Sequence, residues 1–152
     1  MDQSHRKILL GLLGEKIVAK LLRDQGHTVE ESLNVFYSAK DLLVNGKHVE
    51  VKTQVPLLFK DAFTVGTNQL SKIRSSYVVY WVSVPPTKTR DDCAGYVYQL
   101  NPRANMQFSL WTNREGRESV IIPRKQAAMK VVHVIEDPTL LAHLKELSSS
   151  YL

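Results

Sequence analysis

Apolar residues recur at helical spacing near both ends of the chain. In residues 5–25 they fall every three or four positions, and the leucines of residues 138–147 repeat in a similar way. This periodicity predicts an amphipathic α-helix in each place. Gly26 supplies the expected end of the first helix, while Asp137-Pro138 gives the second an N-cap and a first-turn proline.

Between these helices, short runs of β-forming residues are separated by turn signals. Residues 77–84 are almost continuously apolar, which is typical of a central strand buried on both faces. Other elements are expected at these positions: strands at 27–31, 95–100, 107–112, 118–122 and 129–135, and a short helix at 68–75.

This order of elements predicts an α/β fold, with a mixed β-sheet flanked by helices. No internal repeat, linker or shift in composition marks a boundary, so one domain is expected over residues 1–152. Its core is expected over about residues 5–100, with further strands and a helix added over about 101–152.

Asn45-Gly46 predicts a tight β-hairpin, because both central residues of a type I′ turn need positive φ. A two-residue loop fixes the register and places Asp41 opposite Glu50. Residues 57–63 are expected to wrap over this polar side of the hairpin. The remaining expected pairs are Val44 with Lys47, Leu43 with His48 and Leu42 with Val49. Because side chains alternate, the face of Glu50 also carries His48, Lys52 and Gln54.

Two opposed carboxylates have Cβ atoms roughly 5 Å apart and repel each other. A shared proton, a bound cation or full exposure to solvent would relieve that repulsion. A hard divalent cation prefers carboxylate oxygens, so a metal site is one hypothesis for Asp41 and Glu50. A solvated hairpin in which Glu50 pairs with Lys52 is the other, and both stay open at this point.

Glu15 lies on an apolar face of the first predicted helix, so its charge needs a partner. A structural Arg or Lys would serve as well as a metal. Gly11 and Gly14 flank it, and residues without side chains would let the helix approach another backbone closely. His48 shares the face of Glu50, so a part in the chemistry stays open, but an ordinary surface histidine is the safer interpretation.

The formal net charge of +5 is unevenly distributed. Residues 62–135 hold ten Lys and Arg against four Asp and Glu, whereas residues 1–61 are nearly balanced. Arg114 and Arg117 lie in a predicted hairpin loop, which fits a phosphate contact or simply a solvated turn. A basic surplus away from an acidic site suits a protein that binds phosphates around a metal.

Cellular location and metal type are constrained by what the sequence lacks. A single cysteine, Cys93, excludes an intramolecular disulfide, and the scattered histidines do not have zinc-site spacing. No apolar run approaches the roughly 20 residues of a membrane span. The N-terminus has no signal-peptide core, so a cytoplasmic protein without membrane contact is expected.

Asp41, followed on the next strand by Glu50-Val51-Lys52, resembles the metal site of the PD-(D/E)XK nucleases, the restriction-endonuclease-like superfamily. Asp41 matches the family's aspartate, Glu50 its second acidic residue and Lys52 its lysine. Glu15 matches a glutamate that many members carry in the helix before the hairpin.

The resemblance covers roughly residues 8 to 85, and Lys40 stands where the family name has proline. It is nearest to the Holliday-junction resolvases, with small restriction and homing endonucleases close behind. It implies a restriction-endonuclease-like core, to which the C-terminal β-hairpin and helix are additions.

The resemblance also implies a divalent-metal-dependent DNA endonuclease that hydrolyses phosphodiester bonds. Mg²⁺ is the implied cofactor, with Mn²⁺ expected to substitute. Lys52 would orient the attacking water or stabilise the developing charge, and Gln54 would position either group. The implied metal ligands are Asp41, Glu50, Glu15 and the carbonyl of Val51.

Site-specific cleavage of restriction or homing type, structure-specific cleavage such as junction resolution, and an inactive nucleic-acid-binding module of the same fold all stay open. Double-stranded DNA is the expected partner. Cutting two strands needs two active sites, which predicts a homodimer or a higher symmetric oligomer. The expected DNA contacts are Lys72, Arg74, Arg114, Arg117, Arg124 and Lys125.

Overall fold

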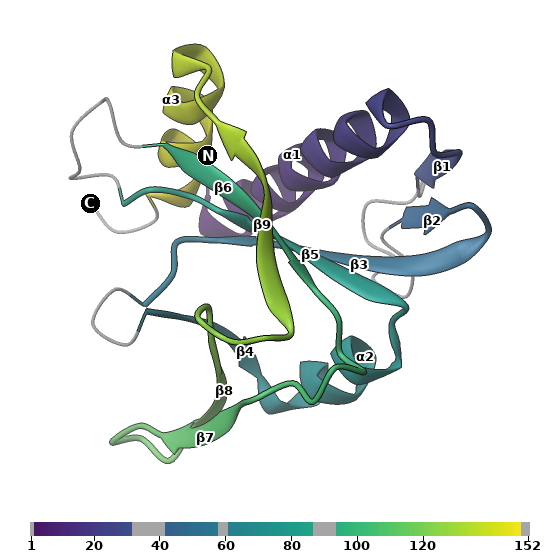
Figure 1. Ribbon diagram of the computed structural model, residues 1–152. Coiled ribbons are helices and arrows are strands. Elements are labelled where there is room, and N and C mark those ends of the chain that lie inside the picture. Colours follow the sequence, from purple (N-terminus) through teal and green to yellow (C-terminus); the bar gives the residue numbers. More distant parts are fainter. Residues whose placement is uncertain (1, 32–41, 58–60, 87–93, 150–152) are drawn as a thin grey trace.

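The computed structural model describes residues 2–31, 42–57, 61–86 and 94–149, and Figure 1 shows how their elements are arranged. Along the chain these are α1 (Gln3–Asp24), β1 (Val29–Glu31), β2 (Leu42–Val44), β3 (Lys47–Gln54), β4 (Ala62–Gly66), the 3-10 turn η1 (Thr67–Gln69), α2 (Leu70–Ser75), β5 (Val78–Ser83), β6 (Gly95–Leu100), β7 (Ser109–Thr112), β8 (Glu118–Pro123), β9 (Met129–Ile135) and α3 (Pro138–Ser148). Within the described ranges they form a single α/β domain with three α-helices, a six-stranded mixed sheet and a three-stranded antiparallel sheet.

The larger sheet has the strand order β1-β2-β3-β5-β6-β9, and β3 pairs with β5 in parallel while the other pairs are antiparallel. β5 is buried along nearly its whole length, as its continuous apolar run predicts. Parallel pairing of β3 and β5 needs a crossover between them. The chain supplies it through β4, η1 and α2.

The β2–β3 hairpin has the predicted turn and register. Asn45 and Gly46 have φ values of 51° and 81°, which are the positive values that a type I′ turn requires. Leu42 pairs with Val49, and the two following pairs also match the prediction. Asp41, the residue expected opposite Glu50, lies outside the described residues.

α1 and α3 lie on one side of the large sheet, where their apolar faces pack against it (Figure 1). The side chain of Asp2 caps α1 by accepting a hydrogen bond from the His5 backbone N–H at 2.8 Å. Gly26, with φ of 93°, follows the helix as predicted. Gly14 lies so close to β3 that an added Cβ would be 1.7 Å from Thr53 Oγ1.

No helix in the described ranges is long and apolar enough to cross a membrane.

The opposite side of the large sheet is covered by α2 and by the small sheet, whose strand order is β4-β8-β7 (Figure 1). The predicted strands at 107–112 and 118–122 do form a hairpin, but β8 also pairs with β4. Of the segment 57–63 that was expected to wrap over the polar side of the hairpin, residues 58–60 lie outside the described residues, and β4 begins at Ala62. Phe63 of β4 stacks on Trp81 of β5 with ring centroids 4.7 Å apart, which ties the small sheet to the large one.

Candidate functional site

Glu50 is the one acidic side chain that is buried within the described residues, with 1% of it exposed. It lies in the middle of β3, beside Val79 of the parallel strand β5. Val49 and Val51 point into the core beneath α1, so alternation directs Glu50 to the other face, toward α2 and the small sheet. A carboxylate buried this deeply needs charged or hydrogen-bonding partners.

Two lysines supply those partners, and both approach the same carboxylate oxygen. Lys52 Nζ lies 3.1 Å from Glu50 Oε1, and Lys72 Nζ of α2 lies 3.5 Å from it. Lys52 also donates a hydrogen bond to Gln69 Oε1 at 2.8 Å. The cluster of Glu50, Lys52, Lys72 and Gln69 therefore places two ammonium groups around one carboxylate, and its cationic surplus favours an anion such as a phosphate.

The second oxygen of Glu50 is in a different situation. Glu50 Oε2 and His48 Nε2 are both buried, and neither has a hydrogen-bond partner among the described residues. They lie 4.0 Å apart, which is too far for a direct hydrogen bond. An unpaired buried carboxylate oxygen beside an imidazole nitrogen fits the donor set that a divalent cation takes.

The described residues do not by themselves complete such a centre, since no group of three or more Asp, Glu, His or Cys comes together among them. Asp41 lies outside those residues. Glu15 is half-buried on α1, one residue after Gly14, and α1 covers the face of the sheet opposite to Glu50. Its place in a common ligand set with Glu50 stays a prediction, as does the use of the Val51 carbonyl.

Gln54, the last predicted catalytic residue, holds β4 against β3. Its side-chain Nε2 donates to the carbonyl of Thr64 at 2.8 Å, and its Oε1 accepts from the Thr64 N–H at 2.9 Å. Both ends of the amide are thus used by the backbone of one residue. These contacts are structural, and a catalytic role for Gln54 stays a prediction.

The predicted DNA-binding residues differ in how far their side chains are paired with acidic groups. Lys72 turns to Glu50, as described above. The Arg124 guanidinium pairs with the carboxylate of Asp61 and lies 3.3 Å from Ser83 Oγ. Lys125 is 91% exposed, and its Nζ is 3.7 Å from Asp61 Oδ2.

The other predicted contacts keep more of their exposure. Arg74 on α2 is exposed and lies over the ring of Phe108, with its Cζ 5.3 Å from the ring centroid. Arg114 and Arg117 belong to the turn between β7 and β8, which Figure 1 places at the far end of the small sheet. Their binding of DNA stays a prediction.

Sequence reasoning missed Gln69, and it placed His48 on the face of Glu50 without predicting that its Nε2 is buried. His48, expected to be a surface histidine, has its Nε2 buried beside Glu50, and its position two residues earlier on the same strand face was the available signal. Gln69 comes from η1, and its bond to Lys52 depends on how the crossover folds back over β3.

Searches against protein-family models, curated proteins and solved structures found no match to this chain.

Proposed function

We propose that this chain is a divalent-metal-dependent DNA endonuclease of the PD-(D/E)XK type. The observation that supports this best is the buried carboxylate of Glu50, with Lys52 on its Oε1 and no hydrogen-bond partner for its Oε2 among the described residues. In this proposal α1, the β2–β3 hairpin, β5 and α2 belong to a restriction-endonuclease-like core. The β7–β8 hairpin and α3 are the additions.

In the proposed centre Glu50 Oε2 is one metal ligand and Asp41 is the second, with Glu15 bound directly or through water. The Val51 carbonyl is a further candidate oxygen. This ligand set matches the preference of Mg²⁺, and of Mn²⁺ in its place, for oxygen donors. When bound, the ion would stabilise negative charge on the scissile phosphate and lower the pKa of a water molecule.

In this proposal two lysines of the chain supply positive charge beside the metal centre. Lys52 is held between Glu50 and Gln69, so its ammonium is fixed in position before a substrate arrives. A fixed ammonium can orient a nucleophilic water and offset charge that develops on a phosphate oxygen. Lys72 approaches from α2 and adds a second positive charge on the same side.

A nucleic-acid-binding module without catalysis is the second candidate, and the ion pairs of Glu50 with two lysines favour it, since they would balance the buried charge without any metal. The proposal includes both site-specific and junction-specific cleavage, and a comparison of DNA substrates distinguishes them. Double-strand cleavage would require a symmetric oligomer, most simply a homodimer.

The deciding experiment incubates the protein with supercoiled plasmid, a linear library and a cruciform in Mg²⁺, Mn²⁺ or Ca²⁺, and sequences any new ends. We expect cleavage with Mg²⁺ and Mn²⁺. Glu50→Gln should abolish cleavage and also the rise in melting temperature that metal gives the wild type, because a ligand that binds only the folded state stabilises it. Lys52→Ala should abolish cleavage but keep the metal-dependent rise.

Glu30→Gln is the matched control, because Glu30 is an exposed acidic residue of β1. It should leave cleavage and the metal response unchanged. Circular dichroism checks that each variant is folded. If wild type cuts none of the DNAs in any metal but binds them, the module without catalysis is favoured, and a metal response preserved in Glu50→Gln would reject Glu50 as a ligand.

A further inference from the structure

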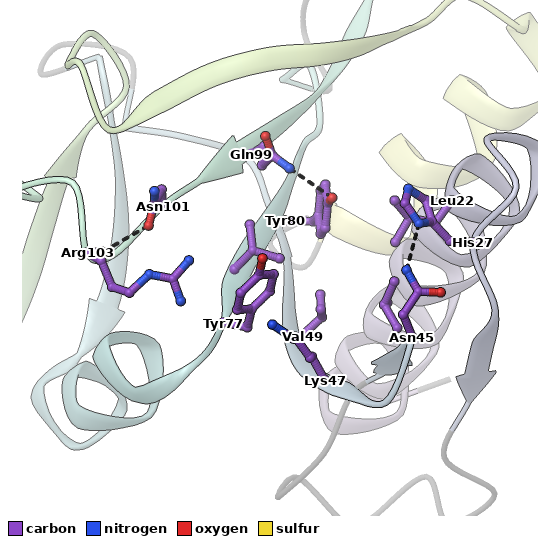
Figure 2. Close-up of a pocket in the computed structure, with 12 residues that line it drawn as sticks. Leu22, His27, Asn45, Lys47, Val49, Tyr77, Tyr80, Gln99, Asn101 and Arg103 are labelled. Atoms are coloured by element: carbon purple, nitrogen blue, oxygen red, sulfur yellow. Dashed lines mark hydrogen bonds between the residues drawn. The ribbon is translucent and has the colours of Figure 1, made fainter.

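A concave site lies on the α1 side of the large sheet, near the β2–β3 turn. It is a cavity of about 380 Å³ at the end of the sheet where β3 and β5 begin and β6 finishes. Figure 2 shows the side chains that line it, which come from α1 and the segment after it, the β2–β3 hairpin, β5 and the residue before it, and β6 and the segment after it. Glu50 points to the opposite face, so this cavity is separate from the site described above.

The floor of the cavity presents a hydrogen-bonding pair. Gln99 Nε2 donates to the hydroxyl oxygen of Tyr80 at 3.0 Å, and Figure 2 marks this contact with a dashed line. Within the described residues, no acceptor takes the Tyr80 hydroxyl proton and no donor reaches Gln99 Oε1. Burial raises the pKa of Tyr80, against a smaller lowering by the Gln99 hydrogen bond, so the hydroxyl keeps its proton at neutral pH.

The mouth of the cavity is cationic and aromatic. Lys47 Nζ lies 4.1 Å and Arg103 Cζ 4.5 Å from the centroid of the Tyr77 ring, and Figure 2 shows the two side chains approaching it from different sides. Tyr77 is 45% exposed, so part of its surface is open to a ligand. No Asp or Glu is among the described residues that line the cavity, and an anion would meet only positive charge there.

The rest of the lining has the character of a small-molecule site. Leu22, Val49 and Val78 provide apolar walls. Asn45 is fixed by a 2.9 Å contact with His27 Nδ1, visible in Figure 2. Ligand pockets of roughly 300–1,000 Å³ combine apolar walls with a few polar groups in this way, and this one lies at the small end of that range.

We propose that this cavity binds a single unstacked nucleotide, with the base inside and the phosphate at the mouth. A nucleobase is flat and carries adjacent donors and acceptors, which match the hydroxyl proton of Tyr80 and the amide oxygen of Gln99, the groups that no described residue takes up. Its phosphate would lie between Lys47 and Arg103, which supply charge-assisted hydrogen bonds. The nucleotide is either a free mononucleotide or one residue of a strand, and the second source rests on the proposed nucleic-acid binding.

The experiment titrates the protein with each of the four deoxynucleoside monophosphates, with deoxyribose 5-phosphate and with inorganic phosphate, by calorimetry in EDTA. EDTA removes metal, so failure of the nuclease proposal would leave this result unaffected. We expect at least one mononucleotide to bind more tightly than the base-free phosphates. Tyr80→Phe should weaken the binding of that nucleotide about tenfold, since it removes one hydrogen bond in a buried place. It should leave the binding of phosphate unchanged.

Lys47→Ala with Arg103→Ala should weaken the binding of nucleotide and of phosphate to a similar degree. Lys20 is an exposed lysine on α1 outside the cavity, so Lys20→Ala should change the binding of neither ligand. Gln99→Met is the second floor variant if Tyr80→Phe does not fold. Competition of the mononucleotide with a single-stranded oligonucleotide would identify a strand as the source, whereas independent binding would identify the free nucleotide. Absence of nucleotide binding at millimolar concentration, or binding indifferent to both floor variants, would overturn the proposal.

Discussion

Glu31 is a carboxylate that gains two cationic partners when the chain folds. Its Oε1 lies 3.0 Å from Lys16 Nζ, and its Oε2 lies 3.0 Å from Arg23 Nη1. Burial by itself would raise the pKa of Glu31, but the hydrogen bonds and charges of Lys16 and Arg23 outweigh it and leave the pKa lowered. Folding therefore favours the ionised form of this side chain.

This shift predicts a small dependence of stability on pH. A lowered pKa stabilises the folded state above the unfolded value of 4.5, and that contribution is lost as the pH falls through the folded-state value. Glu31→Gln should lower the free energy of unfolding at pH 7 by less than about 1 kcal/mol, because both cations are largely exposed. At pH 3 the difference from wild type should shrink, as measured by urea denaturation.

Glu30→Gln, on the neighbouring exposed residue, serves as the control and should have no such dependence. A loss that is equal at pH 7 and pH 3 would show that the ion pairs of Glu31 are not its cause.

At the scale of single residues, sequence reasoning located part of the candidate site. The type I′ turn fixes the register, and alternation then places Glu50 and Lys52 on one face, so their contact could be predicted. The partners Lys72 and Gln69 come from another element, and no local rule places them beside Glu50. The prediction that Lys72 contacts DNA did not include its contact with Glu50. The identity of a charged residue in a short helix does not show whether its side chain faces solvent or another element.

At the scale of elements, the ones with strong local signals were predicted well. α1, β6, β9 and α3 begin or end within a few residues of the expected positions, since helical periodicity, caps and turn residues mark them. β4 was not predicted. Its residues 62–66 follow no clear alternation between apolar and polar, and its partner β8 lies more than fifty residues later in the chain.

The packing of α1 on β3 predicts that alanine substitutions at two glycines of α1 change the stability of the fold in opposite directions. A Cβ at Gly14 would lie 1.7 Å from Thr53 Oγ1 and 2.9 Å from Thr53 Cβ, so Gly14→Ala forces the helix away from the sheet. We expect it to destabilise the fold by about 1–3 kcal/mol, as overpacking does. A Cβ at Gly11 meets nothing within 4 Å, so Gly11→Ala should stabilise by up to about 1 kcal/mol.

Urea denaturation of the two variants measures this difference directly. Thr53→Gly, combined with Gly14→Ala, should recover part of the lost stability because it removes the atoms in conflict. If Gly14→Ala proved as stable as Gly11→Ala, the close approach of α1 to β3 would be wrong.

At the scale of the whole molecule, folding leaves only some of the basic surplus of residues 62–135 available to a partner. Lys72 and Arg124 are paired with Glu50 and Asp61. Arg114 and Arg117 lie at the turn of the β7–β8 hairpin, at the far end of the small sheet (Figure 1). On β7, Leu110 is 61% and Trp111 46% exposed, so this hairpin offers apolar as well as cationic surface.

Such a hairpin is suited to contact DNA, with the arginines on phosphates and the exposed aromatic against a groove or an unstacked base. We expect Arg114→Ala with Arg117→Ala to weaken DNA binding and to reduce the slope of log affinity against log salt by about 0.9 for each phosphate that an arginine no longer neutralises. Lys7→Ala with Lys20→Ala removes the same charge from the exposed surface of α1 and should change the slope less. Fluorescence anisotropy at several salt concentrations, in Ca²⁺, provides the measurement.

Sedimentation of the same variants separates a DNA contact from a contact between subunits. The proposed homodimer should persist in the hairpin variant if the arginines contact DNA. Because Leu110 and Trp111 could equally be covered by a second copy, an unchanged salt slope together with loss of the dimer would assign this hairpin to the subunit interface. A monomer in wild type, both free and on DNA, would instead contradict the homodimer itself and leave double-strand cleavage without its second active site.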